Sequence, residues 1–85
     1  MLMSLLKGII DDKILKIIQL FMTHPNELYH INKVAEETVI PVSTTFRIMK
    51  KLVKLGIIQY RTISKFKVYH LANNDKTKKL KKIIG

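Results

Sequence analysis

The fold of this chain is decided by Ile40-Pro41-Val42-Ser43-Thr44-Thr45-Phe46-Arg47-Ile48-Met49-Lys50-Lys51-Leu52-Val53-Lys54-Leu55-Gly56-Ile57-Ile58. Pro41 suits the first turn of a helix, where the N–H that proline lacks has no intrahelical partner. In a helix that starts there, one face is apolar and is expected to be buried: Thr45, Ile48, Met49, Leu52 and Leu55. Gly56 can adopt the positive φ that commonly ends a helix. The stretch therefore predicts an amphipathic helix followed at once by an apolar strand.

Apolar spacing predicts two further helices upstream of this one. Asp11-Asp12 supply a cap and favourable negative charge at the start of a helix that ends at His24-Pro25-Asn26. Its apolar positions are Ile14, Leu15, Ile17, Ile18, Phe21 and Met22. Leu28-Tyr29-His30 suits a short strand, and Asn32 is expected to cap the next helix, which ends at Thr38 with Val34 and Ala35 facing inward. Val39-Ile40 is then the turn between this helix and the one that begins at Pro41.

Downstream of Gly56, two β-rich runs at residues 57–63 and 66–71 are joined around Ser64-Lys65 and predict a hairpin. A last helix is expected from Asn74 or Asp75 to Ile84, and a short one within residues 1–10. This order predicts an α+β fold, mainly α. The predicted architecture is a winged helix-turn-helix, which is a three-helix core with a β-hairpin wing, flanked by N- and C-terminal helices. Residues 1–85 are expected to form a single domain.

Charge is divided very unevenly along the chain. The net charge is +10, yet residues 1–40 carry four Lys/Arg against five acids, a net of −1. Residues 41–85 carry twelve Lys/Arg against Asp75 alone, a net of +11. Such asymmetry indicates an anionic partner for the second half. The basic outer face of the helix after Pro41 has the shape and chemistry that fit a DNA major groove.

The run from Leu28-Tyr29-His30-Ile31 to Gly56-Ile57-Ile58 resembles the winged helix-turn-helix of bacterial and archaeal transcriptional regulators of the MarR, ArsR, IclR and TrmB types. Residues 40–49 are most similar to the recognition helix of the last two, and residues 52–58 to the junction into the wing. The resemblance covers about residues 11–72 and implies a transcriptional regulator that binds DNA. Val39 departs from the pattern, because many relatives have glycine there. The paired cysteines of metal-sensing ArsR proteins and a separate effector domain are also missing, so no small-molecule ligand is expected.

Ten residues are expected to contact DNA. On the helix, Arg47 suits bidentate pairing with guanine, Ser43 and Thr44 suit phosphate or base edges, and Val42 or Phe46 suits a thymine methyl. The remaining cations belong to the helix and the hairpin, where they are placed for phosphates or the minor groove: Lys50, Lys54, Arg61, Lys65 and Lys67. A plainer interpretation makes Ser43 and Thr44 helix caps, leaves the cations solvated, and packs Phe46 under the wing or a neighbouring subunit.

The two ends of the chain are interpreted as dimerisation helices. Their apolar residues are Leu2, Leu5, Leu6, Ile9, Leu80, Ile83 and Ile84. Regulators of this class commonly dimerise through helices outside the winged core, and a two-fold dimer matches a palindromic site. The five lysines of residues 76–82 are also compatible with a DNA-touching arm or with a frayed, well-solvated end.

Other chemistry finds little support in the sequence. The chain has no cysteine, and His24, His30 and His70 are scattered, so no metal site is expected. No nucleophile with a base, no phosphate-binding glycine loop and no paired carboxylates are recognisable, so neither an enzyme nor a cofactor is expected. No segment has the roughly 18 apolar residues of a membrane span. A cytoplasmic location follows from these expectations, and the richness in Ile and Lys without Cys or Trp resembles small proteins of archaea or their viruses.

The residues thus favour a dimeric, sequence-specific DNA-binding regulator, most simply a repressor. Two alternatives remain open at this point. One is a winged helix that docks on other proteins in a replication or transcription assembly through Val42, Phe46 and the N-terminal apolar face. The other is a chromatin-type binder that uses the same cations without reading bases.

Overall fold

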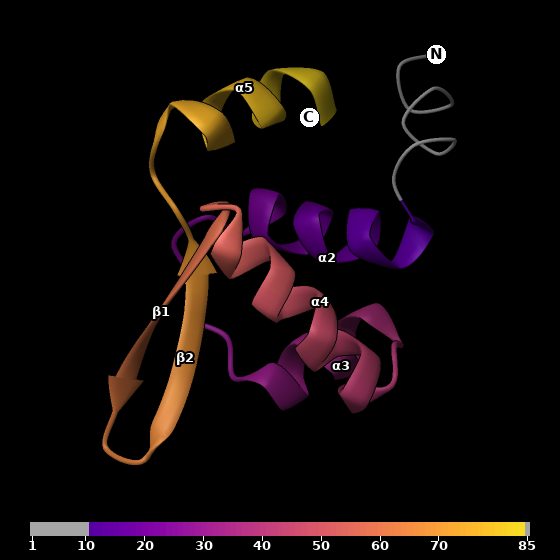
Figure 1. Cartoon of the computed structure of the whole chain (residues 1–85), viewed down its shortest axis with the longest axis vertical. Coiled ribbons are helices and arrows are strands. Elements are labelled where there is room, and N and C mark those ends of the chain that lie inside the picture. Colours follow the sequence, from indigo (N-terminus) through magenta and orange to yellow (C-terminus); the bar gives the residue numbers. More distant parts are fainter. Residues whose placement is uncertain (1–10, 85) are drawn as a thin grey trace.

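The computed structural model describes residues 11–84, and these form a winged helix-turn-helix (Figure 1). The elements are α2 (Asp12–Thr23), α3 (Ile31–Thr38), α4 (Val42–Lys54), β1 (Ile58–Ile63), β2 (Phe66–Leu71) and α5 (Asp75–Ile84). The fold class expected from the sequence is therefore confirmed. The helix expected within residues 1–10 lies outside the described residues.

The starts of α2 and α3 show how side chains set helix boundaries. Asp11 caps α2 as predicted, because its carboxylate accepts the N–H of Lys13 at 2.8 Å. The prediction of Asn32 as the cap of α3 is wrong. His30 is the capping residue, and its ring Nδ1 accepts the N–H of Asn32 at 3.2 Å. The reason is the backbone, which is still extended at His30 and already helical at Asn32.

The turn between α3 and α4 is made by Val39 in the left-handed conformation, with φ 56° and ψ 44°. Its N–H and that of Ile40 bond to carbonyl groups of the last turn of α3, at 3.3 and 3.1 Å. The Val39 side chain is 86 % exposed, so packing does not hold it there. A β-branched residue thus occupies a conformation for which glycine or asparagine is preferred.

Helix α4 buries Thr45, Ile48, Met49 and Leu52 as expected. Leu55 was expected on the same buried stripe, and this is wrong, because its side chain is 47 % exposed. Leu55 is the C-cap residue, where the helical spacing that predicted its burial has already ended. Gly56 follows with φ 78° and turns the chain into β1.

Strands β1 and β2 form an antiparallel hairpin in which Ile58 lies opposite Leu71 and Ile63 opposite Phe66. Ser64 has φ 58° and Lys65 has no positive φ, the pattern of a type II′ turn. The short strand expected at residues 28–30 consists of one bridge, in which Tyr29 and Tyr69 exchange two backbone hydrogen bonds of 2.8 Å. This bridge attaches β2 to the segment that leads into α3.

The core lies where α2, α3, α4 and the base of the hairpin meet. Its largest fully buried side chains are Phe21, Ile17, Met49, Leu52, Ile58 and Val34. Phe21 packs edge-on against Tyr29, with ring centroids 5.3 Å apart. The buried aromatic pair therefore joins α2 to the bridge that holds the hairpin.

Helix α5 begins at a reciprocal cap and is bonded to the end of α4. The Asn74 side-chain oxygen accepts the N–H of Thr77 at 2.9 Å, and the Asn74 N–H donates to the Thr77 hydroxyl at 3.2 Å. The Asn74 amide also donates to the Gly56 carbonyl at 2.8 Å, and the Lys76 ammonium donates to the Leu55 carbonyl. These donors satisfy the carbonyls of the C-cap residue of α4 and of the glycine that follows it, which have no helical partners. In Figure 1, α5 lies beyond α2, at the end of the molecule away from the hairpin tip.

Candidate nucleic-acid interface

The residues of α4 that were expected to meet DNA lie on its outer face. Six of them are exposed, Val42, Ser43, Phe46, Arg47, Lys50 and Lys54, and Thr44 is half-buried. No side chain caps the start of α4, because the N-cap is Pro41 and makes no side-chain hydrogen bond. The plainer interpretation of Ser43 and Thr44 as caps is therefore wrong, and their hydroxyls are not used in that way.

A groove of about 460 Å³ separates α4 from the hairpin. It is lined by Phe46, Lys50, Val53, Lys54, Tyr60, Lys67 and Tyr69. The residues of α4 in this lining are spaced three or four apart, which places them on the side of the helix that faces the hairpin. The groove thus has an aromatic and apolar floor and three lysines along it.

Two of these lysines are held over aromatic rings. The Lys50 ammonium lies 5.6 Å from the ring centroid of Phe46, and that of Lys67 lies 4.6 Å from the ring centroid of Tyr60. Both distances are in the range of a cation–π interaction, which orients a lysine without neutralising its charge. Phe46 and Tyr60 are nevertheless 47 % and 46 % exposed.

Tyr60 is a member of this groove that sequence reasoning missed. It lies opposite the buried Tyr69 in the hairpin register, next to the pair Thr62–Lys67 on the same face. The alternation along the two strands contains this signal, because side chains two residues apart share a face. Only the contact of that face with α4 shows that it belongs to the interface.

Arg47 and Thr44 point to the other side of α4. They line a second hollow of about 390 Å³ together with Asp11, Lys13, Ile14, Ile48 and Lys51, between α4 and the start of α2. The exposed face of α4 therefore carries two rows, a Phe46–Lys50–Lys54 row toward the hairpin and a Ser43–Arg47 row away from it. The sequence placed these residues on one face but did not separate the two rows.

The hairpin brings its cations together with apolar side chains at its tip. Arg61 and Lys65 are exposed, while Lys67 faces the groove. Ile63 and Phe66, the last pair before the turn, are 49 % and 59 % exposed. The Phe66 ring packs edge-on against His30, at 5.8 Å between centroids.

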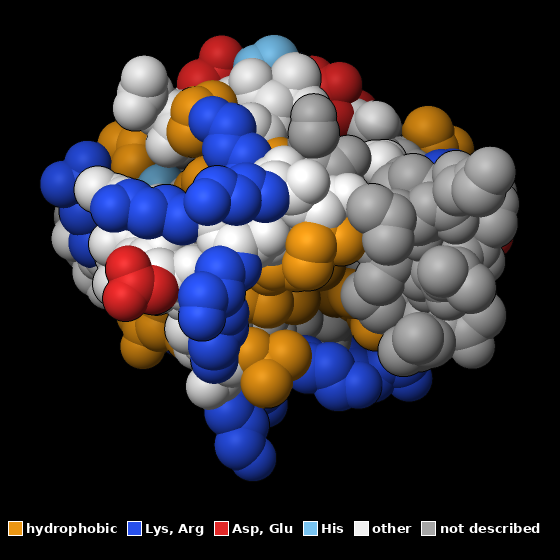
Figure 2. All heavy atoms as spheres, turned by 90° about the horizontal axis from the view of Figure 1, so that it is seen from above, with side chains coloured by type: hydrophobic (Ala, Val, Ile, Leu, Met, Phe, Trp, Pro, Cys, Tyr) orange, Lys and Arg blue, Asp and Glu red, His pale blue; other side chains and the backbone are white. Residues whose placement is uncertain are grey.

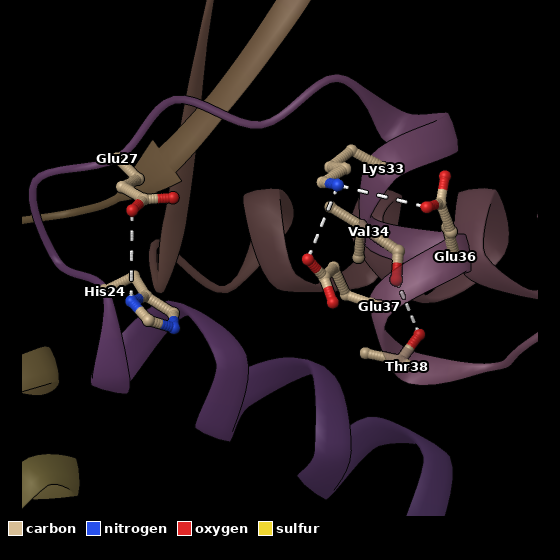
Figure 3. A network of polar contacts seen from close by, with 7 residues as sticks. All are labelled: His24, Glu27, Lys33, Val34, Glu36, Glu37 and Thr38. Atoms are coloured by element: carbon tan, nitrogen blue, oxygen red, sulfur yellow. Dashed lines mark hydrogen bonds and ion pairs between the residues drawn. The ribbon is translucent and has the colours of Figure 1, made fainter.

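The ion pairs of residues 11–84 are confined to the segment from His24 to Glu37. Lys33 pairs with Glu36 and Glu37 at 3.9 and 3.5 Å, and His24 lies 4.0 Å from Glu27 (Figure 3). Within the same range, the cations of α4 and of the hairpin form no ion pair. Their charge is thus available to an external anion, whereas the acidic residues of α3 neutralise the cation beside them.

The C-terminal residues interpreted as dimer contacts differ in their surroundings. Leu80 is half-buried against the core, and Ile83 is 44 % exposed. Lysines gather over α5 in the view of Figure 2, and Lys76, Lys78, Lys79, Lys81 and Lys82 are all exposed. The N-terminal members of the set, Leu2, Leu5, Leu6 and Ile9, lie outside the described residues, as does the side chain of Ile84.

The described region offers little to other kinds of site. Residues 11–84 hold no group of three or more His, Asp or Glu side chains placed to bind a metal ion. Over the same range, no helix has both the length and the apolar character needed to cross a membrane. Burial raises the pKa of Tyr29 to about 12, with Glu27 adding to the effect, and burial likewise raises the pKa of Tyr69. Both phenols are parts of the core rather than reactive groups.

Comparisons with known proteins agree with this geometry. The sequence model of the IclR helix-turn-helix domain matches residues 12–62, a segment that runs from α2 into β1. No curated protein matches the chain significantly in sequence.

Solved structures share the fold at low sequence identity. A protein of Archaeoglobus fulgidus is 21 % identical in sequence and superimposes with a TM-score of 0.74. The match covers 92 % of this chain and 86 % of the Archaeoglobus chain. The homodimeric winged helix-turn-helix DNA-binding domain of a possible ArsR-family transcriptional regulator from Mycobacterium bovis is 17 % identical with a TM-score of 0.71, covering 92 % and 68 %. A MarR family transcriptional regulator from Silicibacter pomeroyi is 15 % identical with a TM-score of 0.65, covering 85 % and 49 %.

Proposed function

The chain belongs to the IclR helix-turn-helix domain family, and from this premise we propose that it is a sequence-specific, double-stranded-DNA-binding repressor that acts as a homodimer in the cytoplasm. The family and the fold are those of DNA-binding transcription regulators. The observation that carries the proposal is the set of cations on α4 and the hairpin, which form no ion pair within residues 11–84 and three of which, Lys50, Lys54 and Lys67, line one groove.

The groove fits the backbone of a DNA strand. A helix enters the major groove of B-DNA, and a hairpin beside it reaches the neighbouring minor groove. One sugar-phosphate backbone separates those two grooves, so it must pass between α4 and the hairpin. Lys50, Lys54 and Lys67 line that passage. Their charge releases counterions from the phosphates and supplies affinity that does not depend on sequence.

Base reading falls to the row of α4 that faces away from the hairpin. The Arg47 guanidinium presents paired donors that match the O6 and N7 acceptors of guanine. Ser43, one turn earlier on the same row, is exposed and reaches phosphate or base edges from the start of the helix. Outside that row, the exposed Val42 and Phe46 add apolar surface suited to a thymine methyl group, although Phe46 belongs to the row that faces the hairpin.

Dimerisation is supported by an exposed apolar residue and by a similar structure, and repression follows from the geometry of a bound dimer. The apolar residues expected at the chain ends include the exposed Ile83, and one of the similar structures is a homodimer. A two-fold dimer would place two copies of α4 about one helical turn of DNA apart and select a palindromic site. Occupying such a site within a promoter excludes the polymerase, which is repression without any effector.

Selection from a random-sequence duplex pool, followed by sequencing at two salt concentrations, tests the proposal. We expect an enriched palindrome that persists at the higher salt. Binding without a motif, collapsing as salt rises, would identify a chromatin-type binder. No binding at either salt would leave docking on another protein as the better account, for which Val42 and Phe46 are the exposed apolar surface.

Arg47→Ala sharpens this test. The variant should lose about 1–3 kcal/mol of discrimination between the selected site and a site with the guanine replaced, while its affinity for unrelated DNA changes little. Lys16→Ala, which removes an exposed cation from α2, serves as the matched control and should leave discrimination unchanged.

A further inference from the structure

The tip of the hairpin carries apolar surface that the core does not use. Ile63 and Phe66 face each other across the turn and are 49 % and 59 % exposed. A hairpin tip that only touches phosphates has no need of two large apolar side chains. Exposed apolar residues at such a position call for a partner that offers both negative charge and apolar surface, since Arg61 lies on the same face of the hairpin and Lys65 lies in its turn.

The tip is also held in place rather than left free. Phe66 packs edge-on against the His30 ring at 5.8 Å, and the Nδ1 atom of that ring caps α3 by accepting the Asn32 N–H. The Tyr29–Tyr69 bridge attaches β2 to Tyr29, the residue that precedes His30 in the chain. The position of the Phe66 ring is therefore set by the helix-turn-helix itself, which lowers the entropy lost when the ring enters a partner.

An unaltered minor groove is too narrow for this tip. The backbones of two paired strands lie about 4.8 Å apart, and side chains add to that width, whereas the minor groove is about 6 Å wide. Apolar side chains that enter a base step unstack it, widen the minor groove and bend the duplex toward the major groove. A bend toward the major groove narrows that groove, so the duplex would close around α4.

We propose that the Ile63–Phe66 pair is an apolar wedge that enters a base step in the minor groove and bends the bound DNA. This inference rests on the proposed function, because it presupposes a duplex seated on α4 and the hairpin. It specifies the partner more closely, as DNA with a flexible pyrimidine–purine step under the hairpin tip, the type of step that kinks most readily.

The experiment uses the full chain and a duplex obtained from the random-pool selection. Dyes at the two ends report bending by energy transfer, and 2-aminopurine at each adenine position in turn reports unstacking by its fluorescence. The variants are Ile63→Thr and the pair Ile63→Thr/Phe66→Thr, since threonine keeps the strand preference and removes the large apolar group. Leu28→Thr, at an apolar residue that is 42 % exposed and outside the hairpin, is the control.

We expect the wild-type protein and the Leu28 variant to bend the duplex by about 20–90°, with a rise of 2-aminopurine fluorescence at one step. The double variant should still bind but leave the duplex straight and stacked, and Ile63→Thr alone should reduce both signals. Since the ring that packs on His30 is that of Phe66, this single variant leaves the packing ring in place and separates the wedge from any loss of the Phe66–His30 packing. Binding by the wild type without bending, bending by the double variant equal to that of the wild type, or conversion of a dimer to a monomer by the double variant would each overturn the wedge. Absence of any duplex binding by the wild type would overturn the proposed function itself.

Discussion

Val39 offers a direct test of the energetics of this fold. At φ 56° it occupies the left-handed region, which costs an L-residue with a Cβ roughly 1–2 kcal/mol. Its side chain is 86 % exposed, so a substitution loses almost no burial. Asparagine tolerates this conformation, and Val39→Asn should raise the free energy of unfolding by about 1 kcal/mol. Glycine relieves the same strain but adds about 0.5–1 kcal/mol of unfolded-chain entropy, so Val39→Gly should gain less.

Thermal unfolding followed by circular dichroism measures the effect. A gain of 1 kcal/mol corresponds to a rise in melting temperature of about 4–8 °C for a domain of 60–100 residues. Val39→Thr is the matched control, because threonine is also β-branched and should leave the melting temperature nearly unchanged. If the asparagine variant melts no higher than the wild type, or if threonine gains as much as asparagine, the strain argument is refuted.

Three other outcomes are expected. Asn74→Ala removes the cap of α5 and the bond to the Gly56 carbonyl, and should cost about 1–2 kcal/mol in urea unfolding; an unchanged midpoint would show that α5 is not held there. Lys67→Ala should reduce the slope of log affinity against log salt concentration on the selected duplex by about 0.9, because one phosphate contact is lost. Lys78→Ala in α5, away from the hairpin tip, should leave this slope unchanged. Because burial raises the folded pKa of Tyr29 to about 12 from an ordinary 10.0, the neutral phenol is favoured in the fold, so stability is complete below pH 10 and falls as pH rises from 10 through 12. A stability flat from pH 9 to pH 12 would contradict this assignment.

The sequence predicted the elements well wherever local chemistry decides them. Apolar spacing located α2 and α4, Asp11 fixed the start of α2, and Gly56 fixed the passage from α4 into the hairpin. These signals depend on a few neighbouring residues and are legible without the rest of the fold.

The errors at Asn32 and Leu55 occur at helix boundaries, where residue propensity competes with the path of the backbone. Asparagine is preferred over histidine at an N-cap, yet the backbone is already helical at Asn32 and is extended two residues earlier, so the His30 ring takes that role. Leu55 continues the helical spacing, but the helix ends at Lys54 and the side chain turns outward. Neither boundary can be located from composition.

Which residues of α4 and of the hairpin lie together in the candidate interface could not be predicted from the sequence, for a different reason. Phe46 and Tyr60 are separated along the chain and line the same groove only because the hairpin folds back beside α4. The same holds for Phe66 and His30. Such contacts depend on strand register and on the Tyr29–Tyr69 bridge, which are long-range features. The residues expected to bind DNA and to dimerise remain predictions.

The Tyr29–Tyr69 bridge makes the spacing between α4 and the hairpin a fixed property of the protein. With β2 bonded to the segment that enters α3, the hairpin cannot swing independently to follow DNA of different shapes. In a complex of the proposed kind, the duplex must supply the adjustment, and its cost depends on the stiffness of base pairs that no side chain touches. Two backbone hydrogen bonds far from any base would then contribute to the choice of binding site.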